Sequence, residues 1–310
     1  MTGGDSLRDV ARAYVPMLLV LGAIWGASFL FINVGLRAFH PATLMAFRLV
    51  LAASILLPVL ILRMGAREAL SALGKEGAGL VLGVIAAALP FTLIAWGQTH
   101  VDSGIAAIAN ASMPIFVVLL AFRFRPSERA GGLRLAGVVL GLVGVAVLAG
   151  AQPKGGWWGV LRTLAVVLAA FSYAVGSLYA QHRLGAASGP VIATAQCIAG
   201  ALFLLPFGLA QLPSHGPGWK PLASVLALGI AGTAFATLLY YRIVFLYGSS
   251  RASLVVYLLP PFAVFYGATL LGESLTVEEL IGMVLVLGGV ALGSGAVRLA
   301  RGRAAAPAPP

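Results

Sequence analysis

Long apolar segments are the feature of this chain that most constrains its fold. Ten of them, each about 20 residues long, follow one another, and the short loops between them hold most of the charged residues. A helix of about 20 mostly apolar residues can cross a bilayer. Only 9% of the residues are charged, against about 25% in soluble domains, so no polar segment could cover so large an apolar core. The sequence predicts an all-α integral membrane protein with ten transmembrane helices, over 14–33, 42–62, 78–98, 104–122, 133–151, 158–180, 189–210, 220–246, 252–271 and 278–297.

A ten-residue segment occurs twice. Residues 137–146 (GVVLGLVGVA) and 282–291 (GMVLVLGGVA) are identical at seven of ten positions, and the two copies are five predicted spans apart. An odd number of spans reverses the direction in which a copy crosses the membrane. At an offset of 146 residues, Pro114 also falls on Pro260. The sequence therefore predicts two inverted five-helix repeats, at 14–151 and 152–299, between an N-terminal segment at 1–13 and a disordered tail at 300–310.

The basic residues predict the orientation of the chain. With the N-terminus in the cytoplasm, 14 of the 20 Lys and Arg residues fall on the cytoplasmic side and 4 on the other. Positive charge is concentrated in cytoplasmic loops, so both termini, 1–13 and 300–310, are expected in the cytoplasm. Orientation and contact with anionic lipid also account for the net charge of +11, and no nucleic-acid partner is expected.

An ordered set of motifs resembles the EamA family of the drug/metabolite transporter superfamily over residues 14–297. The first half has WGASF at 25–29 and then Gly35-Leu36, Pro41, Leu44 and Arg48, and the second half has Pro260, Gly272-Glu273, Gly282 and Gly289. The resemblance implies ten helices in two inverted five-helix bundles, and export or exchange of small metabolites such as amino acids. Two departures stand out. The Gly-Glu pair is replaced in the first half by RFRP at 123–126. The first span also lacks the acidic residue of the related small multidrug exporters, which counts against proton-coupled export of cationic drugs.

Charged residues are rare within the predicted spans. All nine carboxylates fall in loops or at span ends, whereas a proton-driven pump usually carries an acid inside the membrane. We therefore expect transport down the substrate gradient without stoichiometric proton movement. Arg48 and Arg242 are the intramembrane charges. Each is interpreted either as a cationic lining that favours a carboxylate-bearing solute, or as an arginine that serves helix packing.

Polar and aromatic residues lie at helical spacing in spans 1, 3, 4, 6, 8 and 9. Such groups can orient a solute inside an otherwise apolar pocket. We predict that seven residues of this set, together with Arg48, bind substrate: Trp25, Ser28, Arg48, Trp96, Asn110, Tyr173, Tyr241 and Tyr257. The alternative for each aromatic residue is ordinary packing or anchoring at the membrane interface.

Three prolines lie near the middle of two spans. Pro114, Pro260 and Pro261 lack a backbone donor and are expected to bend their helices. They are interpreted either as symmetry-related hinges or as static kinks.

Motifs for other kinds of chemistry are missing from the sequence. It has no P-loop and no HExxH motif, its four histidines are scattered among loops, and Cys197 is its single cysteine. We predict no enzyme activity, no catalytic residue, no metal and no cofactor. The sequence favours a secondary carrier of the bacterial inner membrane that exports a small zwitterionic or carboxylate-bearing metabolite, an amino acid first of all, by alternating access as a monomer or homodimer. An exporter of amphipathic drugs and a non-transporting assembly subunit are the alternatives.

Overall fold

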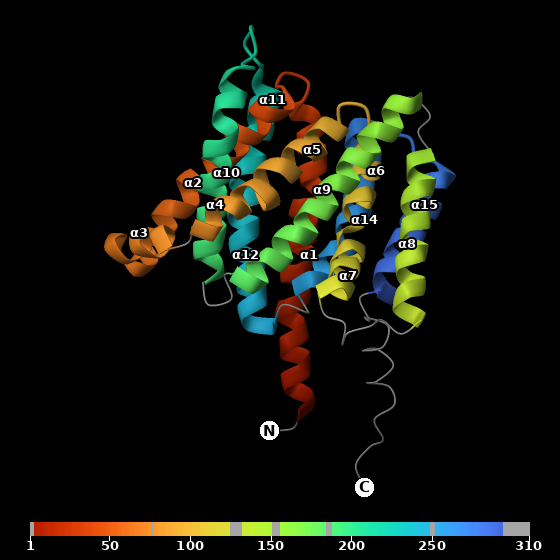
Figure 1. Cartoon of the computed structure of the whole chain (residues 1–310), viewed down its shortest axis with the longest axis horizontal. Helices are drawn as coiled ribbons and strands as arrows, with labels where there is room; N and C mark the ends of the chain where they lie inside the picture. The colour runs from red at the N-terminus through yellow and green to blue at the C-terminus, as the bar shows by residue number, and fades with distance from the viewer. Residues whose placement is uncertain are drawn as a thin grey trace.

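The computed structural model describes residues 3–75, 77–124, 132–150, 156–183, 188–248 and 252–293. Within these ranges every regular element is a helix, and no strand occurs. Eight helical stretches are long and apolar enough to cross a membrane, and a ninth, Leu135–Ala149, is apolar but shorter. The helices form one bundle (Figure 1). The tail predicted at 300–310 and the loop at 125–131 lie outside the described residues.

Seven elements are continuous α-helices. Most begin and end within a few residues of a predicted span, although α1 begins at Gly3 and so includes most of the segment at 1–13. The seven are α1 (Gly3–Gly35), α2 (Pro41–Met64), α3 (Ala66–Lys75), α8 (Gly132–Gly150), α9 (Gly156–Arg183), α10 (Gly189–Leu209) and α15 (Val277–Gly293).

The remaining spans are composite, and three of them contain π-helical segments. The first joins α4 (Gly77–Gly83), the π-helix η1 (Val84–Ala88) and α5 (Leu89–Gly97). The second is α6 (Ser103–Asn110) followed by α7 (Met113–Phe124). The third joins α11 (Trp219–Leu226), the π-helix η3 (Ala227–Phe235) and α12 (Ala236–Tyr247). The fourth joins the 3-10 helix η4 (Ser253–Tyr257), α14 (Leu259–Tyr266) and the π-helix η5 (Gly267–Leu271).

Two of these interruptions coincide with the predicted prolines. Pro114 is the second residue of α7, directly after the turn that ends α6, and Pro260 is the second residue of α14, after the 3-10 helix. A proline in the first turn of a helix has no intrahelical hydrogen bond to lose, so the chain can restart a helix there at little cost. The breaks are present, whereas a hinge function for Pro114, Pro260 and Pro261 stays a prediction.

The short helix α3 was not predicted. It follows Gly65, whose φ of 85° ends α2, and it projects sideways from the bundle (Figure 1). One side of α3 packs against α2 and α10 through Ala69, while Leu70 on the other side is 60% exposed. A helix of ten residues falls below the length of a span, so hydropathy over long windows does not detect it.

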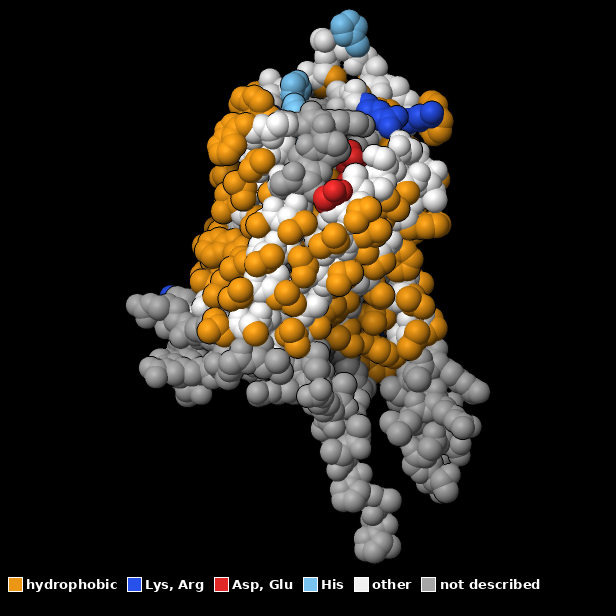
Figure 2. Space-filling model, turned by 90° about the vertical axis from the view of Figure 1, so that its right-hand side faces the viewer, with side chains coloured by type: hydrophobic (Ala, Val, Ile, Leu, Met, Phe, Trp, Pro, Cys, Tyr) orange, Lys and Arg blue, Asp and Glu red, His pale blue; other side chains and the backbone are white. Residues whose placement is uncertain are grey.

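Many large apolar side chains are exposed on the outside of the bundle. Figure 2 shows hydrophobic side chains over the middle of one face, with most of the visible charged and histidine side chains near one end. Large apolar side chains such as Leu62, Val284 and Phe245 are 85%, 67% and 87% exposed. Because monomeric soluble proteins rarely expose apolar patches of this extent, the surface is suited to lipid.

Glycines bring α8 and α15 into close contact at one edge of the bundle (Figure 1). A Cβ atom on Gly289 would lie 2.4 Å from the backbone nitrogen of Gly141 and 2.6 Å from the carbonyl oxygen of Gly137. Small residues of this kind allow helix backbones in membranes to touch. The core that positions the site lies elsewhere, where α2 packs along α10 and both are flanked by the π-helical spans.

Candidate substrate cavity

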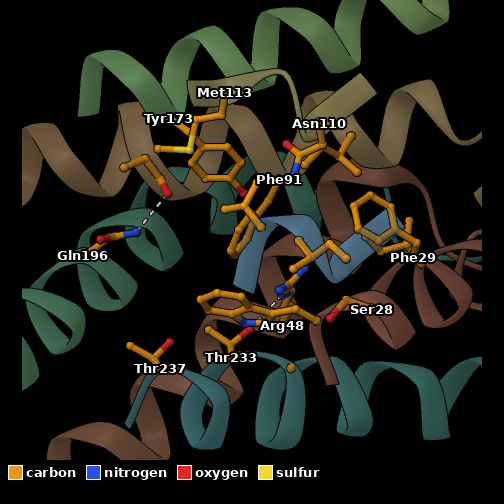
Figure 3. Close-up of a pocket in the computed structure, with 17 residues that line it drawn as sticks. Ser28, Phe29, Arg48, Phe91, Asn110, Met113, Tyr173, Gln196, Thr233 and Thr237 are labelled. Carbon is orange, nitrogen blue, oxygen red and sulfur yellow. Dashed lines mark hydrogen bonds between the residues drawn. The ribbon is translucent and has the colours of Figure 1, made fainter. Parts of the chain in front are cut away.

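A cavity of about 270 Å³ lies at the centre of the bundle (Figure 3). Its wall is formed by residues from both halves of the chain, and most of them are apolar. Five of the eight predicted substrate-binding residues line it: Trp25, Ser28, Arg48, Asn110 and Tyr173. These five residues, predicted from the sequence as one group, come from α1, α2, α6 and α9 and surround the same cavity.

The other three predicted residues do not line this cavity. The indole ring of Trp96 lies under the guanidinium of Arg162, whose carbon is 3.6 Å from the ring centroid. The ring centroid of Tyr241 lies 5.5 Å from that of Tyr240, and Tyr257 packs against the apolar cluster that includes Ile108 and Val286. These three side chains have packing contacts in this structure.

Arg48 is the charged residue of the cavity wall. It is 6% exposed, its Nε donates to the hydroxyl of Thr233 at 2.8 Å, and its guanidinium carbon lies 4.0 Å from the ring centroid of Phe91. None of the described carboxylates forms an ion pair with it. A buried charge without a counter-charge is costly, so the remaining guanidinium nitrogens favour an anion in the cavity. Arg242, by contrast, lies exposed on α12 and does not line the cavity.

Asn110 contributes an unpaired acceptor. It is the last residue of α6, just before the chain turns into α7, and its side-chain oxygen Oδ1 is buried without a hydrogen-bond partner. An unmet buried acceptor costs about 1–3 kcal/mol. A solute that offers an N–H or O–H donor to this atom would recover that energy.

Several residues of the wall lie outside the predicted substrate-binding set. Phe91, Gln196 and Thr233 line the cavity, and the amide of Gln196 donates to the carbonyl oxygen of Ala86 at 2.9 Å (Figure 3). The repeat places Gln196 opposite Arg48, 148 residues earlier, and this mismatch between the two halves predicts that both positions influence substrate preference. Phe91 had no such signal, since the face that α5 turns toward the cavity depends on the π-helix that precedes it.

Known proteins similar to this chain are membrane transporters. The profile of the EamA-like transporter family matches residues 12–150 and again residues 160–294. A probable amino-acid metabolite efflux pump of Salmonella typhimurium is 27% identical over 285 residues, which cover 88% of this chain and 92% of that protein. A probable terminal-alkyne amino-acid exporter of Streptantibioticus cattleyicolor is 34% identical over 209 residues, or 64% of this chain and 67% of that protein.

A solved crystal structure has the same fold. It superposes with a TM-score of 0.66 at 22% identity and covers 95% of this chain and 99% of its own. The family profile, the transporter relatives and the apolar spans together describe a multi-pass membrane protein. Because the profile matches both halves and nearly the whole length, the chain belongs to the EamA-like transporter family.

Proposed function

We propose that this protein is a secondary carrier that exports a small zwitterionic metabolite, an amino acid first of all, across the bacterial inner membrane. The observation that carries the proposal is one cavity that holds both a buried cation with no counter-charge among the described residues, Arg48, and a buried acceptor without a hydrogen-bond partner, Oδ1 of Asn110. The names of two relatives, an amino-acid metabolite efflux pump and an amino-acid exporter, support the substrate class.

The recognition follows from the chemistry of the wall. The carboxylate of the solute would accept hydrogen bonds from the terminal guanidinium nitrogens of Arg48, and its ammonium group would donate to Oδ1 of Asn110. The apolar part would face rings such as Phe91 and Tyr173. A volume of about 270 Å³ lies below the range of about 300–1,000 Å³ typical of pockets for drug-sized ligands. Size and the single cation therefore favour a small metabolite over a bulky amphipathic or cationic drug.

The transport mechanism that we propose is alternating access by two inverted five-helix repeats. Two close helix contacts are related by the repeat. A Cβ atom on Gly83 would meet Ala199, and a Cβ atom on Gly229 would meet Leu51. Gly229 lies 146 residues after Gly83, and Ala199 lies 148 residues after Leu51, so each contact is the counterpart of the other. The two separate matches of the family profile support the same division. Inverted repeats around a central site can rock against each other and open that site to one side at a time.

The environment of the cavity supports uncoupled transport. None of the described residues that line it is acidic, so no carboxylate among them can exchange protons with the solute.

The distribution of Lys and Arg supports a cytoplasmic location for both termini, as part of the same proposal. Of these residues, 14 fall on the cytoplasmic side and 4 on the other.

The first experiment is a binding screen on the purified protein. Thermal unfolding is recorded with amino acids, sugars, nucleobases and cationic dyes, because a ligand that binds only the folded state raises the melting temperature. Amino acids with apolar side chains are expected to stabilise the wild type, and Arg48→Gln is expected to abolish the effect. Arg242→Gln, which changes an arginine outside the cavity, is the matched control. Stabilisation by dyes alone would favour drug export, and no stabilisation by any compound would favour an assembly subunit.

A further inference from the structure

Arg48 and Gln196 hold equivalent places in the two halves of the chain. They are 148 residues apart, on α2 and α10, and both line the cavity. Each reaches a π-helical segment of the other half: Arg48 Nε donates to Thr233 in η3, and Gln196 Nε2 donates to the carbonyl oxygen of Ala86 in η1 (Figure 3). The two contacts are 2.8 and 2.9 Å long. They form a reciprocal pair across the two halves.

The shared role of this pair is to donate a hydrogen bond. A π-helical segment disrupts the regular i to i−4 pattern and leaves backbone groups near it in need of other partners. Gln196 donates directly to such a carbonyl, and Arg48 donates to Thr233, whose hydroxyl in turn donates to the carbonyl oxygen of Leu228 at 2.9 Å. A neutral amide is sufficient for this task at position 196. The positive charge at position 48 is therefore not explained by the hydrogen bond alone.

The positive charge of Arg48 determines the net charge of the cavity wall. Arg48 is the one ionised side chain among the described residues that line the wall. A solute with one carboxylate neutralises it, whereas a second carboxylate would enter a largely apolar space and face only the neutral Gln196.

We infer that Arg48 and Gln196 together set the number of carboxylates that the carrier accepts, and that Gln196 is the residue that excludes dicarboxylic solutes. The inference rests on the proposed function. It assigns a role in substrate selectivity to Gln196, whose hydrogen bond is to the backbone carbonyl of Ala86. It also implies that the cation can occupy either position, because both positions lie on the same cavity and both need a donor.

The test compares L-leucine, L-glutamine and L-glutamate as ligands of the purified protein, by thermal stabilisation and by competition. Glutamine matches glutamate in size and differs in the second carboxylate. The wild type is expected to bind leucine or glutamine at least about tenfold more tightly than glutamate, the factor that one charge-assisted hydrogen bond supplies. Gln196→Arg is expected to raise the affinity for glutamate by about tenfold or more, and Gln196→Lys to act in the same direction.

A double variant tests the equivalence of the two positions. Arg48→Gln is expected to lose binding of all three amino acids, and the exchange Arg48→Gln with Gln196→Arg is expected to restore binding of leucine and glutamine, because the cavity again holds one cation and two donors. Size-exclusion profiles and melting temperatures confirm that each variant is folded. Variants that bind leucine but show no gain for glutamate would overturn the inference and leave the proposed function intact. A wild type that binds no amino acid would overturn both.

Discussion

The backbone N–H of Ser103 donates to both carboxylate oxygens of Glu273, at 2.9 and 3.0 Å. This contact joins the first residue of α6 to the segment that follows η5, and so links the two halves of the chain. Glu273 also donates its own N–H to the carbonyl oxygen of Gly267, while Gln98 donates to the carbonyl oxygen of Phe29 on the cavity wall. Polar contacts therefore tie several spans together, one of them at Phe29, which lines the cavity.

Removal of the Glu273 carboxylate is predicted to destabilise the protein. Hydrogen bonds to a charged group contribute about 1.5–3 kcal/mol, and Ser103 is fully buried, so its N–H would lose its partner without gaining water. Glu273→Ala should lower the free energy of unfolding by about 1–3 kcal/mol, measured by thermal or denaturant unfolding in detergent. Glu278→Ala removes a nearby exposed carboxylate and should have little effect. An equal loss of unfolding free energy in both variants would show that the hydrogen bond between Ser103 and Glu273 does not stabilise the protein.

The same carboxyl is predicted to make stability depend on pH. Burial raises the pKa of Glu273 above its usual range, despite the opposing hydrogen bonds from Ser103. The folded state then holds the proton more tightly than the unfolded chain, so this stabilisation is present below the usual pKa of about 4.3 and is lost as the pH rises through the raised value. Melting temperatures recorded across this window should fall with pH. Glu273→Gln, which keeps an acceptor but cannot ionise, should make the profile less steep, and the slope that remains is expected from Glu279, whose pKa burial raises to about 7. An unchanged slope would contradict the contribution of Glu273.

Adjacent glycines on α15 are predicted to respond differently to alanine. A Cβ on Gly289 would meet the backbone of α8 at 2.4 Å, whereas a Cβ on Gly288 would lie 3.8 Å from its nearest neighbour, a methyl group of Leu140. Gly289→Ala should cost about 1–3 kcal/mol because the two helices must separate, and Gly288→Ala should be tolerated. Unfolding curves of the two variants provide the comparison. Similar stabilities would mean that α8 and α15 are not held in this close contact.

Substrate movement is predicted to occur without proton movement. The described residues of the cavity wall include no acid that could carry a proton with the solute. Proteoliposomes that contain a pH-sensitive dye should therefore show no pH change when an amino acid gradient is imposed, although the amino acid itself enters. A proton flux that appears only with substrate would refute uncoupled transport.

Hydropathy alone predicted most of the helices of this fold. The span predicted at 189–210 is α10 (Gly189–Leu209), and the span at 42–62 lies within α2 (Pro41–Met64). Long apolar runs have this predictive power because a bilayer demands a minimum length of apolar helix. The sequence did not reveal α3, whose short amphipathic pattern resembles a loop in a scan for spans.

The site was harder to predict because local irregularities decide which side chains face the cavity. Ala86 and Phe91 both line it, five residues apart, across the end of the π-helix η1. A regular α-helix would place residues three or four positions after Ala86 on that face instead. The sequence carries no clear mark of a π-helix. The chemistry of Trp96 favours a binding role, but in the structure its ring stacks on Arg162. Arg48 and Asn110 were found because a charge or an amide within a span requires a special environment.

The most direct test of the account is counterflow of L-leucine in proteoliposomes. Vesicles loaded with unlabelled leucine should accumulate labelled leucine transiently when they contain the wild type or Arg242→Gln, and should fail to do so with Arg48→Gln or Asn110→Leu although these variants are folded and inserted. Such a result would place both cavity residues in the transport cycle. Equal counterflow by Arg48→Gln and the wild type, or counterflow by none of the four proteins with leucine or any other amino acid, would contradict the claim that this cavity carries small zwitterions across the membrane.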